Sequence, residues 1–215
     1  MPKKALLLGA TGLTGGILLG QLLESPLYSS VIIYVRKSIE RSHPKLTQLL
    51  VDFETIDTAV EADDVFCCLG TTIKIAGTKA AFEKVDLHYP VKIATLQRAA
   101  GSKQLLVISA MGADSKSSIF YSRTKGLMEA ALQKIGYPSL SIFRPSFITG
   151  NRKEKRMGEQ IGLAIAKLIN PIMVGPLRNY SAVKAAAIVD CMIHHATESQ
   201  PGVHIILSGA IKAFE

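Results

Sequence analysis

The sequence has no tryptophan, few aromatic residues and only three cysteines in 215 residues. Aromatic residues make up 6% of the chain and are dispersed, so they do not form the stacking platform that single-stranded nucleic acids bind. The cysteines, Cys67, Cys68 and Cys191, are odd in number and lack metal-ligand spacing, which predicts reduced thiols rather than a disulfide framework. The five histidines also lack such spacing, and we expect no metal site.

Long apolar runs are missing as well. The apolar stretch from Ile161 to Val174 contains Lys167 and Pro171, so we interpret it as a buried helix rather than a membrane span. Leu6 to Leu8 is too short for a secretory signal and runs directly into glycines. We therefore expect a cytoplasmic protein without an integral membrane segment. The chain shows no internal repeat or low-complexity linker, and 48% apolar residues are ample for one core, so we expect a single domain over residues 1–215.

The net charge of +8 raises the question of a nucleic-acid surface. The basic residues are scattered, however, and the densest cluster, Arg152 to Arg156, includes Glu154. A solvated loop explains this cluster better than an RNA or DNA footprint does, and we expect no nucleic-acid partner. Part of the excess charge is available to bind a phosphorylated cofactor.

The organising stretch of the chain is its glycine-rich start. Lys4 to Leu8 is typical of a buried strand, and Leu13 to Leu23 has the apolar spacing of a helix that ends at Ser25-Pro26. Between them, Gly9 permits a tight turn, Gly12 permits a ligand to approach the backbone, and Gly15 permits close helix packing. Because unpaired N–H groups and the positive end of the helix dipole meet here, this turn predicts a pyrophosphate site, with a plain α/β turn as the alternative.

Three later strand ends add candidate cofactor contacts. Val31 to Val35 is a strand that ends at Arg36-Lys37 rather than at an acid, which favours the 2′-phosphate of NADP over the free hydroxyl of NAD. The alternative is that both side chains are ordinary exposed residues. Leu49 to Phe53 reads as a third strand, with Asp52 able to accept from an adenine amino group or simply ending the strand. A fourth strand begins near Asp63 and enters a turn where Leu69 and Gly70 lie along the cofactor.

The rest of the chain continues the alternation of strands and helices. Its expected helices and strands are helix Phe82–Ala100, strand Gln104–Ser109, helix Ile119–Ile135, strand Leu140–Phe143, helices Met157–Asn170 and Ser181–His195, and strand Val203–Leu207. This order predicts an α/β fold with a doubly wound parallel sheet and a ligand crevice at the carboxyl ends of the strands.

Tyr121 and Lys125 lie four residues apart on the helix predicted after the fifth strand, so they share a face. A neighbouring ammonium favours the phenolate form and brings a phenol toward use as an acid or base. Ser109, at the end of the fifth strand, is placed to donate a hydrogen bond to the same substrate oxygen. These three residues predict a site for carbonyl reduction or alcohol oxidation, in which a nicotinamide carries the hydride.

The combination resembles a known family. Gly9 to Gly15, Ser109, Tyr121 with Lys125, and Arg144 to Gly150 are similar to the motifs of the short-chain dehydrogenase/reductase superfamily, in its extended and atypical branches. With Val85 to Tyr89 and the short C-terminal part, the chain most resembles the small Tat-interacting-protein-like oxidoreductases. The resemblance runs from Lys3 to about Gly209.

The resemblance implies a Rossmann domain that binds NADP and has a short C-terminal substrate-side segment, contributed by residues 145–180. Its implied cofactor residues are Gly9, Ala10, Thr11, Gly12, Leu13, Thr14, Gly15, Arg36, Lys37, Asp52, Phe53, Leu69, Gly70, Tyr121, Lys125, Pro145 and Phe147. The asparagine that many members use in a proton relay corresponds to Asp86 here, which leaves that relay open.

We therefore expect an NADP-dependent oxidoreductase that acts on a small carbonyl or alcohol, with Tyr121 as acid/base and Ser109 and Lys125 in support. The alternative is a catalytically weak NADPH-binding regulator that acts through a protein partner. The sequence indicates neither the substrate nor the oligomeric state.

Overall fold

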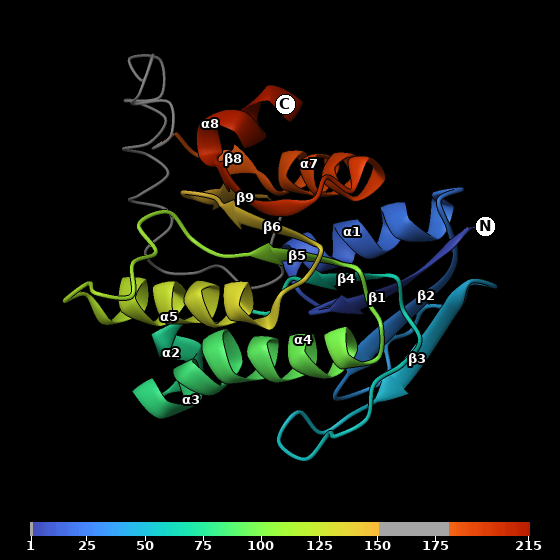
Figure 1. Cartoon of the computed structure of the whole chain (residues 1–215), viewed down its shortest axis with the longest axis horizontal. Coiled ribbons are helices and arrows are strands. Elements are labelled where there is room, and N and C mark those ends of the chain that lie inside the picture. Colours follow the sequence, from blue (N-terminus) through green and yellow to red (C-terminus); the bar gives the residue numbers. More distant parts are fainter. Residues whose placement is uncertain (1, 151–180) are drawn as a thin grey trace.

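A computed structural model describes residues 2–150 and 181–215. Seven parallel strands form the central sheet, in the order β3-β2-β1-β4-β5-β6-β9 (Figure 1). The chain builds outward from β1 in one direction, then crosses back to β4 and builds outward in the other. The sheet order therefore reverses beside β1, which is where doubly wound sheets bind their ligands. The predicted fold class is confirmed.

The first half of the chain forms one side of the sheet and its glycine turn. The elements are β1 Lys3–Leu8, α1 Leu13–Glu24, β2 Tyr28–Val35, β3 Leu46–Leu50, β4 Asp64–Cys67, α2 Ile73–Ala76, α3 Lys79–Glu83, a π-helical segment η1 Lys84–His88, and α4 Tyr89–Ala99.

The second half adds the remaining strands and helices. These are β5 Gln104–Ile108, α5 Phe120–Ile135, β6 Ser139–Arg144, the short strands β7 Ile148–Thr149 and β8 Val183–Lys184, α7 Ala185–Glu198, β9 Gly202–Leu207, α8 Ser208–Ile211 and the 3-10 turn η4 Lys212–Phe214. Gly136 ends α5 in the left-handed conformation, at φ 75°, which glycine adopts readily at a helix C-terminus.

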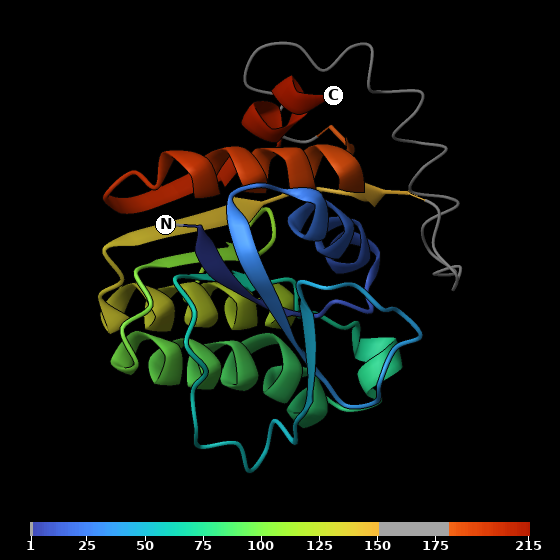
Figure 2. The same cartoon turned by 90° about the vertical axis from the view of Figure 1, so that its right-hand side faces the viewer.

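Helices cover both faces of the sheet, which explains why its strands read as continuous apolar runs (Figures 1 and 2). On one face, α1 and α7 pack together, with Leu18 and Ile188 among their fully buried residues. On the other face, α4 and α5 pack together over Leu140 and Ile142 of β6. Among the described residues, no helix is both long and apolar enough to cross a membrane.

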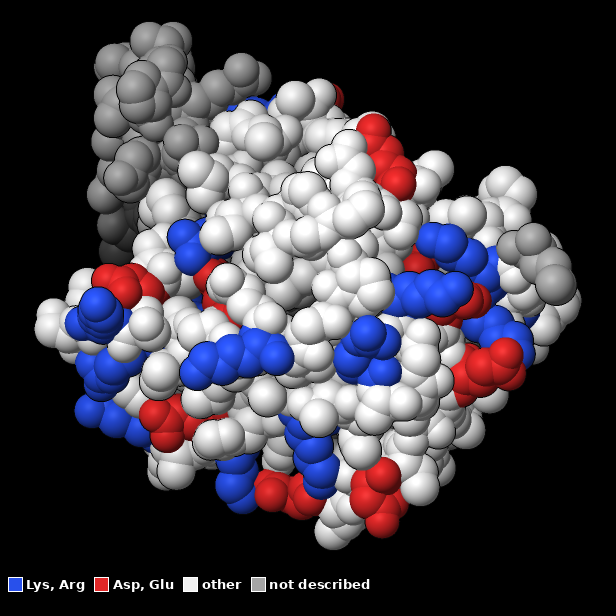
Figure 3. Space-filling view, viewed as in Figure 1, with Lys and Arg blue, Asp and Glu red and all other residues white. Residues whose placement is uncertain are grey.

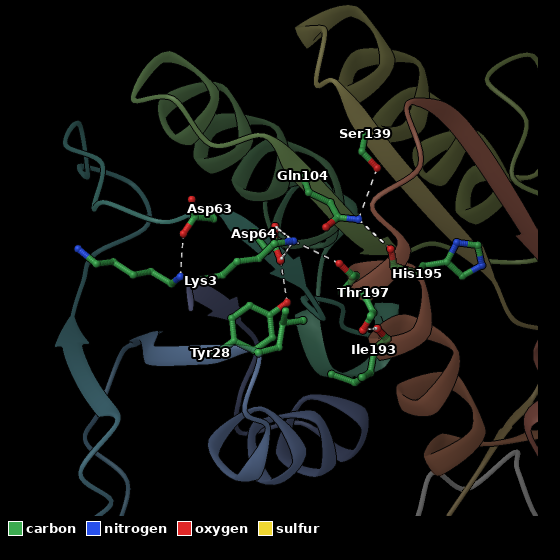
Figure 4. A network of polar contacts seen from close by, with 12 residues as sticks. Lys3, Tyr28, Asp63, Asp64, Gln104, Ser139, Ile193, His195 and Thr197 are labelled. Carbon is green, nitrogen blue, oxygen red and sulfur yellow. Dashed lines mark hydrogen bonds and ion pairs between the residues drawn. The ribbon is translucent and has the colours of Figure 1, made fainter. Parts of the chain in front are cut away.

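A buried polar network joins the strands at the amino edge of the sheet, opposite the glycine turn (Figure 4). Asp64 accepts hydrogen bonds from the Tyr28 hydroxyl at 2.7 Å and from Lys3 Nζ at 3.0 Å. Lys3 also donates to the Ala196 carbonyl of α7, at 3.3 Å. Burial, and then the neighbouring Asp63, favour the neutral carboxyl and raise the pKa of Asp64, although Tyr28 and Lys3 oppose this rise. The network links β1, β2, β4 and α7 away from the candidate site.

The structure corrects several predicted boundaries. The third strand spans Leu46–Leu50 rather than Leu49–Phe53, because the pairing with β2 sets Leu50 opposite Val35. Helix α7 begins at Ala185 rather than at Ser181, since the short strand β8 precedes it. The helix predicted over 82–100 begins at Lys79 and contains the π-helical segment. The helix predicted over 157–170 lies outside the described residues.

Candidate cofactor and catalytic site

The glycine turn after β1 has the backbone that the sequence predicts. Gly9 has φ +83°, and a Cβ on it would lie 2.6 Å from the Cys68 carbonyl oxygen in the turn after β4. A Cβ on Gly15 would lie 2.1 Å from the Gly9 carbonyl oxygen. A Cβ on Gly12 would lie 3.4 Å from that oxygen, so the protein itself leaves room for it. Only Gly9 and Gly15 are therefore required by the fold, and Gly12 is open for contact with a ligand.

A cavity of about 480 Å³ lies along this turn, at the carboxyl ends of β1 and β2. Its lining combines backbone from the turn with the basic residues that end β2 and one apolar residue from the turn after β4. The residues that line it are Gly9, Ala10, Thr11, Tyr34, Val35, Arg36, Lys37, Phe53 and Leu69. Most of these were predicted cofactor contacts, and the structure brings them together.

The predicted adenine-side residues Asp52 and Phe53 behave differently. Phe53 lines the cavity and stacks on Tyr89 with ring centroids 5.4 Å apart. The exposed Asp52 accepts a hydrogen bond from the Glu54 N–H at 2.9 Å and another from the Thr55 hydroxyl at 3.3 Å. Asp52 thus shapes the turn that follows β3, and its role toward adenine stays a prediction.

The turn after β4 connects the cavity to the predicted catalytic residues. Leu69 lies in the cavity, and two residues later the Thr71 N–H donates to Asp86 Oδ2 at 2.8 Å. Asp86 Oδ1 in turn lies 2.7 Å from Lys125 Nζ. Both charged side chains are almost completely buried, with exposed fractions of 1% and 4%. Lys125 is therefore held at the end of a continuous series of contacts that begins at the glycine turn.

Lys125 and Tyr121 share one face of α5, as predicted. Burial alone would lower the pKa of Lys125, but the Asp86 carboxylate and Tyr121 outweigh it and raise that pKa. Lys125 is thus a charged ammonium at neutral pH. Tyr121 is 39% exposed and packs its ring against the buried Phe82, with centroids 5.7 Å apart. The Tyr121 side chain is therefore accessible to solvent, whereas Lys125 is buried.

Ser109 lies at the end of β5 as predicted, but its hydroxyl is engaged elsewhere. It donates to Glu129 Oε1, and Glu129 also accepts from Arg144 Nε at 3.0 Å. Ser109 and Glu129 are buried, with exposed fractions of 5% and 1%. A substrate contact from Ser109 stays a prediction, and it requires the hydroxyl to change partner.

The stretch after β6 folds back toward the glycine turn. The Pro145 carbonyl accepts from the Met111 N–H at 2.9 Å, and the Phe147 carbonyl accepts from the Val183 N–H at 2.9 Å. Phe147 is exposed, whereas a Cβ on Gly150 would lie 3.0 Å from a methyl group of Leu13 at the start of α1. The segment after Arg144-Pro145 therefore passes close to the start of α1.

Sequence reasoning missed Glu129 and the pairing of Asp86. Glu129 lies four and eight residues after Lys125 and Tyr121, so its helical spacing was a usable signal that it shares their face. The link from Asp86 to Lys125 crosses 39 residues and depends on how η1 packs against α5. No local sequence pattern predicts such a contact.

Comparison with known proteins matches most of the chain to one family model. Residues 9–156 match the family model described as NAD(P)H-binding. Protein HTATIP2 of Rattus norvegicus is 39% identical over 164 residues, which cover 73% of this chain and 67% of that protein. The mitochondrial protein fmp52 of Aspergillus clavatus is 33% identical over 179 residues, covering 79% and 76%.

Solved structures share the fold at low identity. WbmH of Bordetella bronchiseptica in complex with NAD+ superposes with a TM-score of 0.71 at 14% identity, covering 99% of this chain and 79% of that one. The UDP-glucose 4-epimerase of Thermotoga maritima with UDP-glucose gives 0.70 at 16% identity, covering 98% and 80%. The chain therefore belongs to an NAD(P)H-binding family of the atypical short-chain dehydrogenase/reductase type.

Proposed function

We propose that the protein is an NADP-dependent oxidoreductase that transfers hydride between the nicotinamide and a small carbonyl or alcohol. The observation that carries the proposal is the continuous series of contacts from the glycine turn, through Leu69, Thr71 and Asp86, to Lys125 beside Tyr121. A dinucleotide bound along the turn would extend toward this pair. When bound, NADPH supplies the hydride, and Tyr121 moves the proton.

The preference for NADP rests on Arg36 and Lys37. Both are exposed at the end of β2 and both line the cavity, in the region where a ribose 2′-phosphate would lie. A guanidinium binds a phosphate through paired, charge-assisted hydrogen bonds. An acid that would accept from the free hydroxyl of NAD is absent from the end of this strand.

We propose that the chain forms one domain over residues 1–215 and acts in the cytoplasm. Within this domain, residues 145–180 contribute the substrate side. Gly150, on which a Cβ would lie 3.0 Å from a methyl group of Leu13 at the start of α1, supports this for the part that the structure describes. On the face that Figure 3 shows, basic and acidic residues are interspersed, which supports a small-molecule substrate rather than a nucleic acid.

The engagement of Ser109 by Glu129 favours a second candidate function. If that hydroxyl never turns to the substrate, the site binds NADPH and polarises a carbonyl poorly. The protein would then act as a cofactor-dependent regulator of a protein partner.

Turnover separates the two candidates. We expect the purified protein to oxidise NADPH in the presence of at least one compound from a panel of aldehydes, ketones and quinones. Removing the phenol hydroxyl in Tyr121→Phe should reduce kcat by roughly a hundredfold or more, with cofactor affinity changed only a few-fold. Turnover that survives in Tyr121→Phe would contradict this mechanism, and tight NADPH binding without turnover would favour the regulator.

A further inference from the structure

Asp86 and Lys125 form a buried ion pair, with Oδ1 2.7 Å from Nζ. We propose that Asp86 neutralises Lys125 and thereby keeps Tyr121 in its phenol form, so that the site is arranged to donate a proton in carbonyl reduction. This inference rests on the proposed function of the site. It assigns Asp86 as a positioning residue, because Asp86 acts through Lys125.

The carboxylate is held at both of its oxygens. Oδ2 accepts the Thr71 N–H at 2.8 Å, and Oδ1 lies 2.7 Å from Lys125 Nζ. The residue belongs to the π-helical segment η1, which packs against both α4 and α5. Such single-turn π segments are frequent at functional sites. An asparagine would place an NH2 donor at one of these two positions, facing either the Thr71 N–H or the Lys125 ammonium, both of which are donors.

The charge balance explains the effect on Tyr121. With Lys125 charged and Asp86 ionised, the pair is neutral while Tyr121 carries its proton. If Tyr121 lost that proton, its phenolate would compete with the Asp86 carboxylate for one ammonium, and a net negative charge would be added beside this buried ion pair. Both the competition and the added charge oppose ionisation of the phenol.

Other titratable groups near this cluster are neutral or have other partners, and on α3, which packs against Tyr121 through Phe82, Lys79 lies over the Phe120 ring at 5.3 Å. Burial raises the pKa of the Cys67 thiol to about 11, so it carries no charge at neutral pH. Glu129 is paired with Arg144 at the next turn of α5. Arg123, also on α5, donates to the Ser117 and Ser118 carbonyls. Asp86 is therefore the carboxylate that determines the charge balance around Lys125 among the residues that the structure describes.

The reduction step balances with these groups. The substrate carbonyl carbon accepts the hydride that NADPH supplies, and the carbonyl oxygen takes the proton of the Tyr121 hydroxyl. The products are the alcohol and NADP+, and water returns a proton to the phenolate. The reverse reaction needs the phenolate before hydride leaves the alcohol, and Asp86 disfavours that form at neutral pH.

The test measures the ionisation of Tyr121 directly, without cofactor or substrate. Ultraviolet absorbance of tyrosinate is followed against pH, and the Tyr121→Phe variant is subtracted to isolate this residue. We expect no tyrosinate from Tyr121 at neutral pH in the wild type. In Asp86→Asn the rise should move to lower pH by roughly one unit or more, because Lys125 loses its counter-ion. The Glu83→Gln variant removes one charge from the neighbouring helix α3 and should leave the rise unchanged.

Tyrosinate from Tyr121 at neutral pH in the wild type would overturn the inference, as would an unchanged titration in Asp86→Asn. If Asp86→Asn fails to fold, the wild-type titration still tests the inference, because a rise clearly below the ordinary tyrosine range, around pH ~10, would overturn it. Failure of the proposed function would appear separately, as wild-type protein that neither binds nor oxidises NADPH.

Discussion

The three glycines of the first turn meet different physical demands. Gly9 requires a positive φ and lies against the turn after β4, and Gly15 lies against the Gly9 carbonyl. Gly12 has φ −79°, which any residue adopts, and its nearest protein neighbour leaves room for a methyl group. The fold therefore does not require glycine at this position, and its contact with a ligand stays a prediction.

This difference gives a prediction for two matched substitutions. Gly12→Ala should leave the free energy of unfolding within about 1 kcal/mol of the wild type, since it costs only the difference between two N-cap residues. It should weaken NADPH binding by roughly tenfold or more, because the added methyl group occupies space along the turn. Gly15→Ala places a Cβ against backbone and should lower the free energy of unfolding by about 1–3 kcal/mol or more. Urea denaturation and a cofactor titration of both variants measure these effects, and equal loss of stability in the two variants would contradict the assignment.

At the residue scale, sequence reasoning found the residues whose position after a strand places them in the cavity. Arg36, Lys37 and Leu69 line the cavity because they follow strands whose carboxyl ends share one edge of the sheet. Asp52 and Ser109, by contrast, form hydrogen bonds within the protein. Asp52 accepts from the backbone of a local turn, and Ser109 donates to Glu129. A strand-end position does not reveal which hydrogen bond a short polar side chain will make.

Helix α5 carries most of the candidate catalytic machinery and is fixed by a close backbone contact. A Cβ on the buried Gly126, next to Lys125, would lie 2.1 Å from the Ser115 nitrogen and 2.2 Å from the Asp114 carbonyl carbon. The loop between β5 and α5 therefore packs directly on the helix. This contact sets how far α5 lies from the end of β5.

Gly126→Ala should push α5 away from that loop. We expect the substitution to lower the free energy of unfolding by about 1–3 kcal/mol, and to lower kcat more than it raises the KM for NADPH, since Tyr121 and Lys125 move with the helix. Gln133→Ala, at an exposed position of the same helix, is the control and should change neither quantity appreciably. Thermal unfolding and steady-state kinetics provide the comparison; wild-type stability in Gly126→Ala would show that the loop moves freely.

Elements with strong periodicity were predicted well, and weak or interrupted ones were not. Helices α1 and α5 were located within a residue or two at each end, because apolar spacing and a proline or glycine mark their limits. Strand β3 was placed three residues too late because its boundaries depend on pairing with β2. The π-helical segment depends on how η1 packs against α5, which the apolar spacing of the sequence does not encode.

At the scale of the whole molecule, the two ends of the strands differ: their carboxyl ends form one edge of the sheet, and their amino ends form the opposite edge. The carboxyl edge collects the turns after β1, β2 and β4 around the cavity, and the ends of β5 and β6 around Ser109 and Arg144. The amino edge carries the buried network of Lys3, Tyr28 and Asp64. Polar groups needed for stability are thus kept away from those available to a ligand.

The central claim is that the carboxyl edge binds NADP through the glycine turn and Arg36. Calorimetric titration of the wild type and Arg36→Ala with NADPH and with NADH tests it most directly, with Lys103→Ala at the amino edge as the control for loss of one positive charge. We predict that the wild type binds NADPH roughly tenfold or more tightly than NADH, that Arg36→Ala loses this preference mainly through weaker NADPH binding, and that Lys103→Ala keeps it. Equal weakening of both cofactors in Arg36→Ala, or no binding of either by the wild type, would contradict the account.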